Sequence, residues 1–173
     1  MFFDATDLHW CPDVGNGYSS KNHQIKVDSP GKENPWCAMF GSLRYPDGEG
    51  LYTIHERKRH QEVGYHLELL IQSDPEAFWF VVLDNASAHT TELLDSFREQ
   101  YKDRLEMVFL PTYSPHLNLI EKLWCLMRKY VTKNQFYPHL LILCEAVIEW
   151  LHKLPFSQFC SIMGIDEDGL LLV

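Results

Sequence analysis

Short apolar runs separated by turn-forming residues dominate the first 54 positions of the chain. Runs of strand length cover residues 1–10, 23–27, 36–43 and 51–54. Gly, Pro, Asn and Asp residues are frequent in the intervals between them. Closely spaced runs of this kind are typical of strands joined as antiparallel hairpins. The pattern therefore predicts that strands form the first part of the fold.

Helical periodicity begins near residue 57, and two more strand-like runs interrupt it. In the helical segments, apolar residues recur every three or four positions, which places them along one face. The predicted helices cover residues 57–72, a segment that begins at Thr90 or Thr91, and residues 118–131, 138–154 and 156–163. The apolar runs 78–83 and 105–109 predict strands. Together these elements predict a single α/β domain with a mixed sheet flanked by helices.

The continuous apolar run from Phe78 to Leu83 ends directly at Asp84. Its aromatic and β-branched residues predict a strand that is buried on both faces, as in a parallel sheet. Ligands of open α/β sheets bind beyond the carboxyl ends of the strands, so Asp84 is well placed to hold a metal ion. An Asx turn that closes the strand is the alternative interpretation.

The sequence of residues 110–131 predicts a loop followed by an amphipathic helix. Pro111 and Pro115 disfavour helix at the start of this segment. Asn118 is a suitable N-cap, and Glu121 lies three residues further on, as in a capping box. The pattern predicts a helix that presents Glu121 at its first turn. A capping role alone is the alternative for Glu121.

The composition is that of an ordinary globular domain, with 46% hydrophobic and 23% charged residues in 173 positions. The sequence contains neither an apolar run of membrane-spanning length nor a signal-peptide pattern. Five cysteines, an odd number without close pairs, argue against a disulfide framework or a zinc knuckle. Reduced thiols in a cytoplasmic protein are the expectation.

The formal net charge of −9 is unexpected for a domain that holds duplex DNA by itself, because such domains are basic. The most basic cluster is Arg57-Lys58-Arg59-His60. A solvated start of a helix is one interpretation of this cluster, and a phosphate-contacting patch is the other.

Two motifs of the chain occur together in a known family. Asp84-Asn-Ala-x-x-His89 precedes Leu110-Pro-x-Tyr-Ser-Pro-x-Leu-Asn-x-Ile-Glu121-x-x-Trp124, with 36 residues between Asp84 and Glu121. In order and separation, these motifs resemble those of the DDE transposases of the mariner superfamily, in particular its bacterial insertion-sequence branch. The resemblance implies a ribonuclease-H-like fold, with a five-stranded sheet in which the second strand is antiparallel to the others.

The resemblance also implies the site residues. Asp4, Asp84 and Glu121 match the acidic triad that holds two divalent ions, Mg²⁺ or Mn²⁺, and Asp7 is the alternative to Asp4. Three carboxylates suit such hard cations, and an ion pair can activate a water and stabilise a leaving oxygen. His89 matches an auxiliary catalytic position, where it would contact the scissile phosphate or a metal-bound water. A hydrogen-bonding spacer is the alternative role for His89.

The implied function is that of a DNA transposase catalytic domain: it cleaves phosphodiester bonds at transposon ends and joins the 3′-hydroxyl to target DNA. DNA is the implied partner, with a homodimer in the DNA complex and no membrane. Residues 1–173 match the catalytic part alone, without the helix-turn-helix region that lies upstream in the family. That missing region would account for the acidic charge.

The chain differs from the family pattern at Ala5 and His116, where the family has acids, and at Leu119, where it has Pro. These differences and the acidic charge are consistent with an alternative, an inactive or domesticated relic that acts in binding or assembly. A nuclease without strand transfer, or another metal-dependent phosphoesterase on a similar sheet, would use the same acids.

Overall fold

The computed structural model describes residues 1–23, 26–85, 92–112 and 114–166. Five strands form one sheet in the order β3-β2-β1-β4-β5. Their bounds are β1 Phe2–His9, β2 Trp36–Leu43, β3 Gly50–His55, β4 Trp79–Leu83 and β5 Leu105–Phe109. β2 is antiparallel to β1 and β3, and β1, β4 and β5 are parallel. The expected sheet, with its second strand antiparallel to the others, is confirmed.

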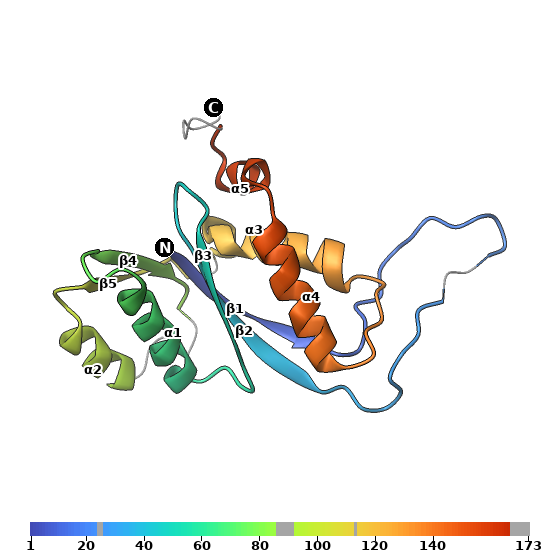
Figure 1. Cartoon of the computed structure of the whole chain (residues 1–173), viewed down its shortest axis with the longest axis horizontal. Helices are drawn as coiled ribbons and strands as arrows, with labels where there is room; N and C mark the ends of the chain where they lie inside the picture. The colour runs from blue at the N-terminus through green and yellow to red at the C-terminus, as the bar shows by residue number, and fades with distance from the viewer. Residues whose placement is uncertain (24–25, 86–91, 113, 167–173) are drawn as a thin grey trace.

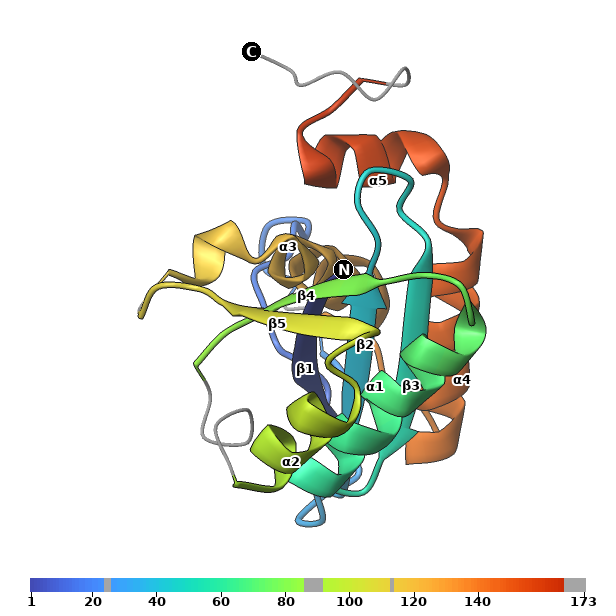
Figure 2. The same cartoon turned by 90° about the vertical axis from the view of Figure 1, so that its left-hand side faces the viewer.

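Five α-helices cover the two faces of this sheet (Figures 1 and 2). They are α1 His60–Ser73, α2 Glu92–Gln100, α3 Leu119–Met127, α4 Leu140–Lys153 and α5 Phe156–Met163. α1 and α2 pack on one face, and α3, α4 and α5 pack on the other. In the ranges that the structure describes, no helix is long and apolar enough to cross a membrane.

β1 and β2 separate two hydrophobic cores because their side chains alternate between the faces of the sheet. Phe3 and Phe40 belong to the core beneath α1 and α2. Leu8 and Met39 belong to the core beneath α3, α4 and α5. All four side chains are fully or almost fully buried. The central strands are therefore fixed from both sides, which holds β1 rigidly in the middle of the fold.

The prediction that residues 78–83 are buried on both faces is wrong. Trp79, Val81 and Leu83 pack into the core beneath α1 and α2. Phe80 points to the opposite face and is 60% exposed. The helices on that face pack on β1 and β2, so β4 is covered from one side only.

Several predicted boundaries also differ from the structure. Residues 23, 26 and 27 are irregular, not a strand, and residues 24 and 25 lie outside the described part. α1 begins at His60 and not at residue 57, and α4 begins at Leu140 and not at Pro138. The expected cap at Thr90 or Thr91 lies outside the described residues. The helix over 156–163 is confirmed, and Gly164 ends it in the left-handed conformation.

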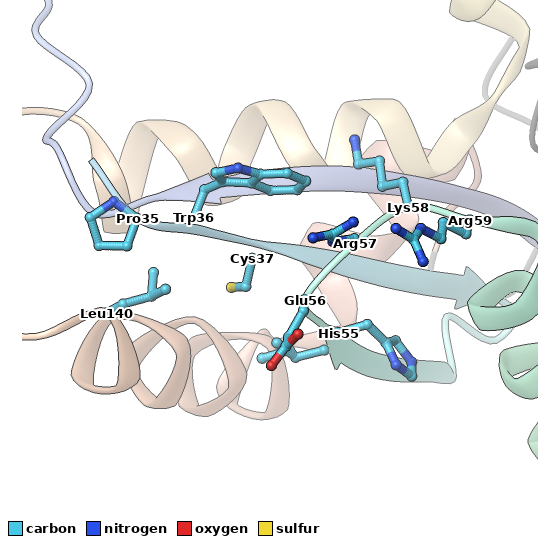
Figure 3. A pocket seen from close by; sticks show the side chains of 10 residues that line it. Pro35, Trp36, Cys37, His55, Glu56, Arg57, Lys58, Arg59 and Leu140 are labelled. Atoms are coloured by element: carbon cyan, nitrogen blue, oxygen red, sulfur yellow. The ribbon is translucent and has the colours of Figure 1, made fainter. Parts of the chain in front are cut away.

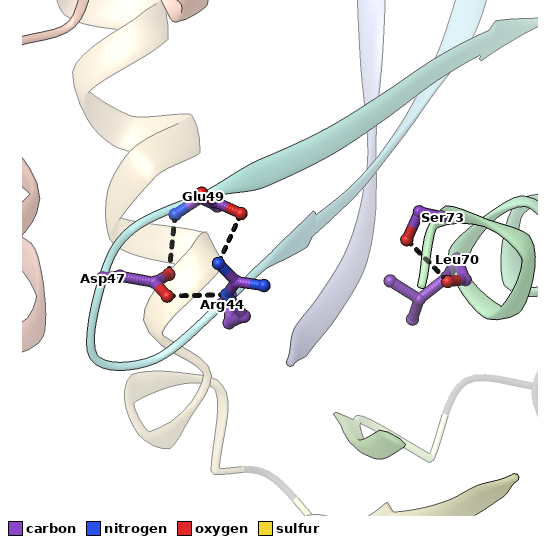
Figure 4. A network of polar contacts seen from close by, with 5 residues as sticks. All are labelled: Arg44, Asp47, Glu49, Leu70 and Ser73. Atoms are coloured by element: carbon purple, nitrogen blue, oxygen red, sulfur yellow. Dashed lines mark hydrogen bonds and ion pairs between the residues drawn. The ribbon is translucent and has the colours of Figure 1, made fainter. Parts of the chain in front are cut away.

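Ion pairs stabilise the turn that connects β2 and β3 (Figure 4). Arg44 Nε donates a hydrogen bond to Asp47 Oδ2 over 2.6 Å, and the same guanidinium pairs with Glu49. The backbone N–H of Glu49 donates to Asp47 Oδ1 over 3.1 Å. These contacts fix the register of β2 against β3. They thereby define where the chain leaves β3 toward α1.

Gly41 in β2 lets α3 approach the sheet closely. It lies opposite Asp4 in the β1–β2 register. A Cβ atom at Gly41 would lie 2.7 Å from Trp124 Cη2 and 2.8 Å from Ile120 Cδ1. A side chain here would push α3 away from β1. The absence of a side chain at Gly41 therefore determines how near α3 comes to Asp4.

Gly41→Ala is expected to lower the free energy of unfolding by about 1–3 kcal/mol, because the extra methyl group overpacks the contact with α3. Urea unfolding measures the change. Gly64→Ala is the control, since a Cβ at Gly64 meets nothing within 4 Å. In the middle of α1 that control is expected to stabilise by about 0.5–1 kcal/mol. Equal destabilisation by both substitutions would contradict the packing argument.

Candidate active site

Acids from three separate elements line one cavity of about 340 Å³. Asp4 comes from the middle of β1, Asp84 directly follows β4, and Glu121 lies in the first turn of α3. β1 and β4 are adjacent parallel strands, which brings the first two acids to the same region of the sheet. The structure thus places the three acids singled out in the sequence around a common space.

Burial and neighbouring charges strongly perturb the pKa of Asp4. Its pKa is raised to about 7, mainly because burial disfavours the charged carboxylate. The negative charge of Glu121 raises this pKa further, and Asp84 adds to the effect. A hydrogen bond from the backbone of Ala5 and the charge of Lys58 act in the opposite direction. The carboxylates therefore interact electrostatically across the cavity.

Trp124 holds the Asp4 carboxylate from the side of α3. Its Nε1–H donates a hydrogen bond to Asp4 Oδ2 over 3.1 Å. The Trp124 ring is fully buried. In the sequence, Trp124 is a motif residue three positions after Glu121, and nothing there indicates the contact with Asp4. The ring thus both anchors α3 and fixes the orientation of the acid.

Asn118 fixes the start of α3 against β1 rather than capping the helix with its side chain. It occupies the predicted N-cap position, but its side chain forms no capping hydrogen bond. Instead, Nδ2 donates to the backbone oxygen of Phe3 over 3.0 Å. The capping-box prediction is therefore wrong. The contact ties the first turn of α3, with Glu121, to the residue that precedes Asp4.

The chain that follows β4 is tied to the chain that follows β5. The backbone N–H of Leu110 donates to Leu83 O over 2.9 Å. Asn85 Nδ2 donates to Leu110 O over 2.5 Å. These two bonds flank Asp84 and hold its backbone at the end of the sheet.

Two cations complete the lining of the cavity, Lys58 and Arg128. Lys58 Nζ donates to Ala5 O over 2.9 Å and lies 3.0 Å from Asp7 Oδ1. Arg128 Nη2 donates to Thr6 Oγ1 over 2.6 Å. Asp7 is thus engaged in an ion pair with Lys58 at the edge of the cavity, whereas Asp4 forms no such ion pair among the residues that the structure describes.

Arg128 and Thr6 also line the cavity, and the sequence did not indicate either of them as a site residue. The one available signal is spacing: Arg128 lies seven positions after Glu121, which places both on one face of a helix. Lys58 is part of the basic cluster noted in the sequence, where two interpretations remained open. Its place in the cavity shows that it is more than a solvated residue at the start of a helix.

The donor set suits a hard divalent cation, because it consists of carboxylate oxygens. Among the described residues, no group of three or more His, Cys, Asp or Glu side chains has the spacing needed to hold an ion. His89, the expected auxiliary residue, lies outside the described residues.

Trp124→Phe is expected to raise the pKa of Asp4 above about 7 in metal-free protein. The indole N–H favours the ionised carboxylate, and phenylalanine cannot donate this bond. Titration of the Asp4 carboxyl carbon by NMR measures the change. Trp79→Phe removes a similarly buried indole from the other core and should leave this pKa in place. An equal shift in both variants would contradict the role of the hydrogen bond.

Comparison with known proteins places these observations in a family. Residues 1–143 match the family described as DDE superfamily endonuclease. The transposable element Tc3 transposase of Caenorhabditis elegans is 31% identical over 90 residues, which cover 51% of this chain and 26% of that protein. An uncharacterized 39 kDa protein of the insertion element IS630 from Shigella sonnei is 22% identical over 135 residues, covering 78% of this chain and 39% of that protein.

Solved structures of the Mos1 transposase share the fold. In its paired-end complex with the left transposon end, the TM-score is 0.71 at 16% identity, over 96% of this chain and 52% of that chain. A Mos1 mariner paired-end complex with Mn gives a TM-score of 0.71 at 14% identity, over 96% and 52% of the two chains. The chain thus spans about half of Mos1. It belongs to the DDE superfamily endonucleases, has their ribonuclease-H-like catalytic fold, and is homologous to the Tc1/mariner and IS630 transposases.

Proposed function

We propose that this chain is the catalytic domain of a metal-dependent DNA transposase, which cleaves phosphodiester bonds at transposon ends and joins the 3′-hydroxyl to target DNA. The observation that carries this proposal is the shared cavity of Asp4, Asp84 and Glu121, in which their charges interact. The Mos1 paired-end complex with the left transposon end and the Mos1 strand transfer complex, which share this fold, support the assignment of DNA as partner.

Asp4, Asp84 and Glu121 would hold two Mg²⁺ or Mn²⁺ ions, both of which occur in Mos1 paired-end complexes. Bound divalent ions supply an activated oxygen nucleophile and stabilise the departing oxygen of a phosphodiester. Asp4 is oriented for this role by Trp124, and Glu121 is positioned by the anchored start of α3. His89 is proposed to contact the scissile phosphate.

The chemistry of these side chains explains why three acids are used. Their combined negative charge is unfavourable in a partly buried cavity, as the raised pKa of Asp4 shows. With divalent cations bound, that repulsion would be removed and all three carboxylates would stay ionised at neutral pH. The carboxylates that repel one another without cations would therefore also attract cations to the site.

The test separates cleavage from joining. The protein is incubated with Mn²⁺, a supercoiled plasmid and a labelled DNA duplex that ends in a free 3′-hydroxyl. We expect nicking of the plasmid and covalent transfer of the label into it, both lost in Asp84→Asn. Nicking without transfer would favour the nuclease. Absence of both activities, together with no heat of Mn²⁺ binding in calorimetry, would favour the relic.

Two further parts of the proposal concern assembly. Residues 1–173 are proposed to form the catalytic domain, with sequence-specific end recognition located in a helix-turn-helix region outside them. Two copies are proposed to act together on paired ends, as the names of the Mos1 complexes describe for that protein. Tight, sequence-selective DNA binding by residues 1–173 alone at physiological salt would contradict the first part. Sedimentation of the DNA complex tests the second.

A further inference from the structure

A large open groove lies beside the acidic cavity, where the chain passes from β3 to α1 (Figure 3). Its volume is about 1170 Å³, and we call it the basic groove. Its lining includes Trp36 from the start of β2 and three consecutive cations, Arg57, Lys58 and Arg59. Figure 3 shows Trp36 toward one end of the groove and the cations toward the other.

The three cations outnumber Glu56, the acid that also lines this groove, so the charge of the lining is opposite to that of the whole chain. The net charge is −9, and the chain has only 15 Lys and Arg residues. Arg57 and Arg59 are both exposed. Among the described residues, neither of them forms an ion pair, so their guanidinium groups are available to an anion. A local positive field on an acidic protein favours binding of a polyanion at this groove.

Lys58 connects the basic groove to the acidic cavity, because it lines both. Its ammonium group is held by Ala5 O and Asp7, close to the strand that carries Asp4. A strand whose phosphates contact Arg57 and Arg59 would therefore pass beside Lys58 and the acidic cavity that it lines.

Trp36 adds an exposed aromatic surface to this path. Its side chain is 42% exposed, although it is the first residue of a strand whose other residues are all buried. Exposed indole rings beside cations are the combination that holds single-stranded nucleic acids, since bases stack on the ring while cations contact the phosphates. Duplex DNA offers no unpaired base for such stacking.

We propose that the basic groove binds a single-stranded DNA segment next to the phosphodiester that reaches the acidic cavity. Arg57 and Arg59 contact its phosphates, and a base stacks on Trp36. This inference rests on the proposed function, because it takes DNA as the substrate. It goes beyond that function in two ways: it names the surface that guides the DNA strand, and it states that the bases on this surface are unpaired.

The test measures binding of a fluorescently labelled oligothymidylate of about 20 nucleotides, longer than one such binding site, by anisotropy in EDTA. Arg57→Ala with Arg59→Ala should reduce the slope of log affinity against log salt by about 1.4, because each phosphate contact on a single strand contributes about 0.7. Trp36→Leu should weaken binding about tenfold, since stacking of one base is of that order. It should leave the salt slope unchanged.

A matched control removes two positive charges elsewhere, with Lys102→Ala and Lys153→Ala, at exposed sites outside the groove. An equal loss of slope in this control would overturn the proposal. So would unchanged binding by Trp36→Leu, or tighter binding of a duplex of equal length that is insensitive to Trp36. Urea unfolding of each variant shows whether a loss of binding reflects a loss of folding; if Trp36→Leu is unfolded, Trp36→Phe, which should retain part of the stacking, replaces it.

The experiment is independent of the catalytic proposal because it contains no metal ion and reads binding alone. If the wild-type protein binds the oligothymidylate as expected but does not nick DNA, the proposed transposase function is contradicted and the proposed binding in the basic groove is supported. If the wild-type protein nicks and transfers DNA, but the variants show neither the reduced salt slope nor the weaker binding of Trp36→Leu, only the proposed binding in the basic groove is contradicted.

Discussion

Glu121→Gln is expected to lower the rate of Mn²⁺-dependent DNA cleavage by about a thousandfold. Metal ions contribute several kcal/mol of charge stabilisation to the transition state, and each 1.36 kcal/mol is a factor of ten in rate. Glutamine keeps the shape of the side chain but loses the charge that would hold a cation. Plasmid nicking under single-turnover conditions measures the change.

The same substitution has a second readout that does not depend on DNA. Because the charge of Glu121 raises the pKa of Asp4, Glu121→Gln should lower that pKa in metal-free protein. Glu145→Gln, at an exposed position of α4, is the matched control and should change neither quantity. Cleavage within tenfold of wild type by Glu121→Gln would contradict the role of this acid.

Asp4→Asn is expected to stabilise the metal-free protein at pH 8 by roughly 2–4 kcal/mol, following the size of the pKa shift. The folded-state pKa of about 7 lies above the ordinary aspartate pKa of 3.8, which applies in an unfolded chain. Between these values the folded state binds more protons than the unfolded state. Stability of the wild-type protein should therefore fall as pH rises from about 4 to 7, and stay low above 7.

Urea unfolding in EDTA at pH 5 and pH 8 measures this effect. The gain from Asp4→Asn should be largest at pH 8, where the wild-type carboxylate must be charged in its buried site. Asp103→Asn, at an exposed position, is the control and should show no such gain. Addition of Mn²⁺ should stabilise the wild type and not Asp4→Asn. A pH-independent difference between the two proteins would contradict the account.

The sequence predicts much of the fold because local pattern and tertiary structure agree. The run 36–43 forms β2 at the predicted bounds, and residues 156–163 form α5 with Gly164 at its end. Asp84 stands at the end of a strand because an apolar run stops there. These features depend on periodicity and turn residues, which a single sequence displays directly.

The features that the sequence does not predict depend on contacts between distant segments. Trp124 lies 120 positions from Asp4, to which it donates a hydrogen bond. Asn118 lies 115 positions from Phe3, whose backbone oxygen accepts a hydrogen bond from the Asn118 side chain in place of a capping contact. Phe80 is exposed because of where the helices pack, and not because of its own strand. Lys58 is ambiguous in the sequence until the β2–β3 hairpin brings it to the cavity.

The central claim is that Asp4, Asp84 and Glu121 together bind divalent cations. The most direct test is anomalous diffraction from crystals of the chain soaked in Mn²⁺. The account predicts two anomalous peaks between these three carboxylates, and their loss in Glu121→Gln or Asp84→Asn. A map without manganese at these side chains, at a concentration that supports nicking, would contradict it.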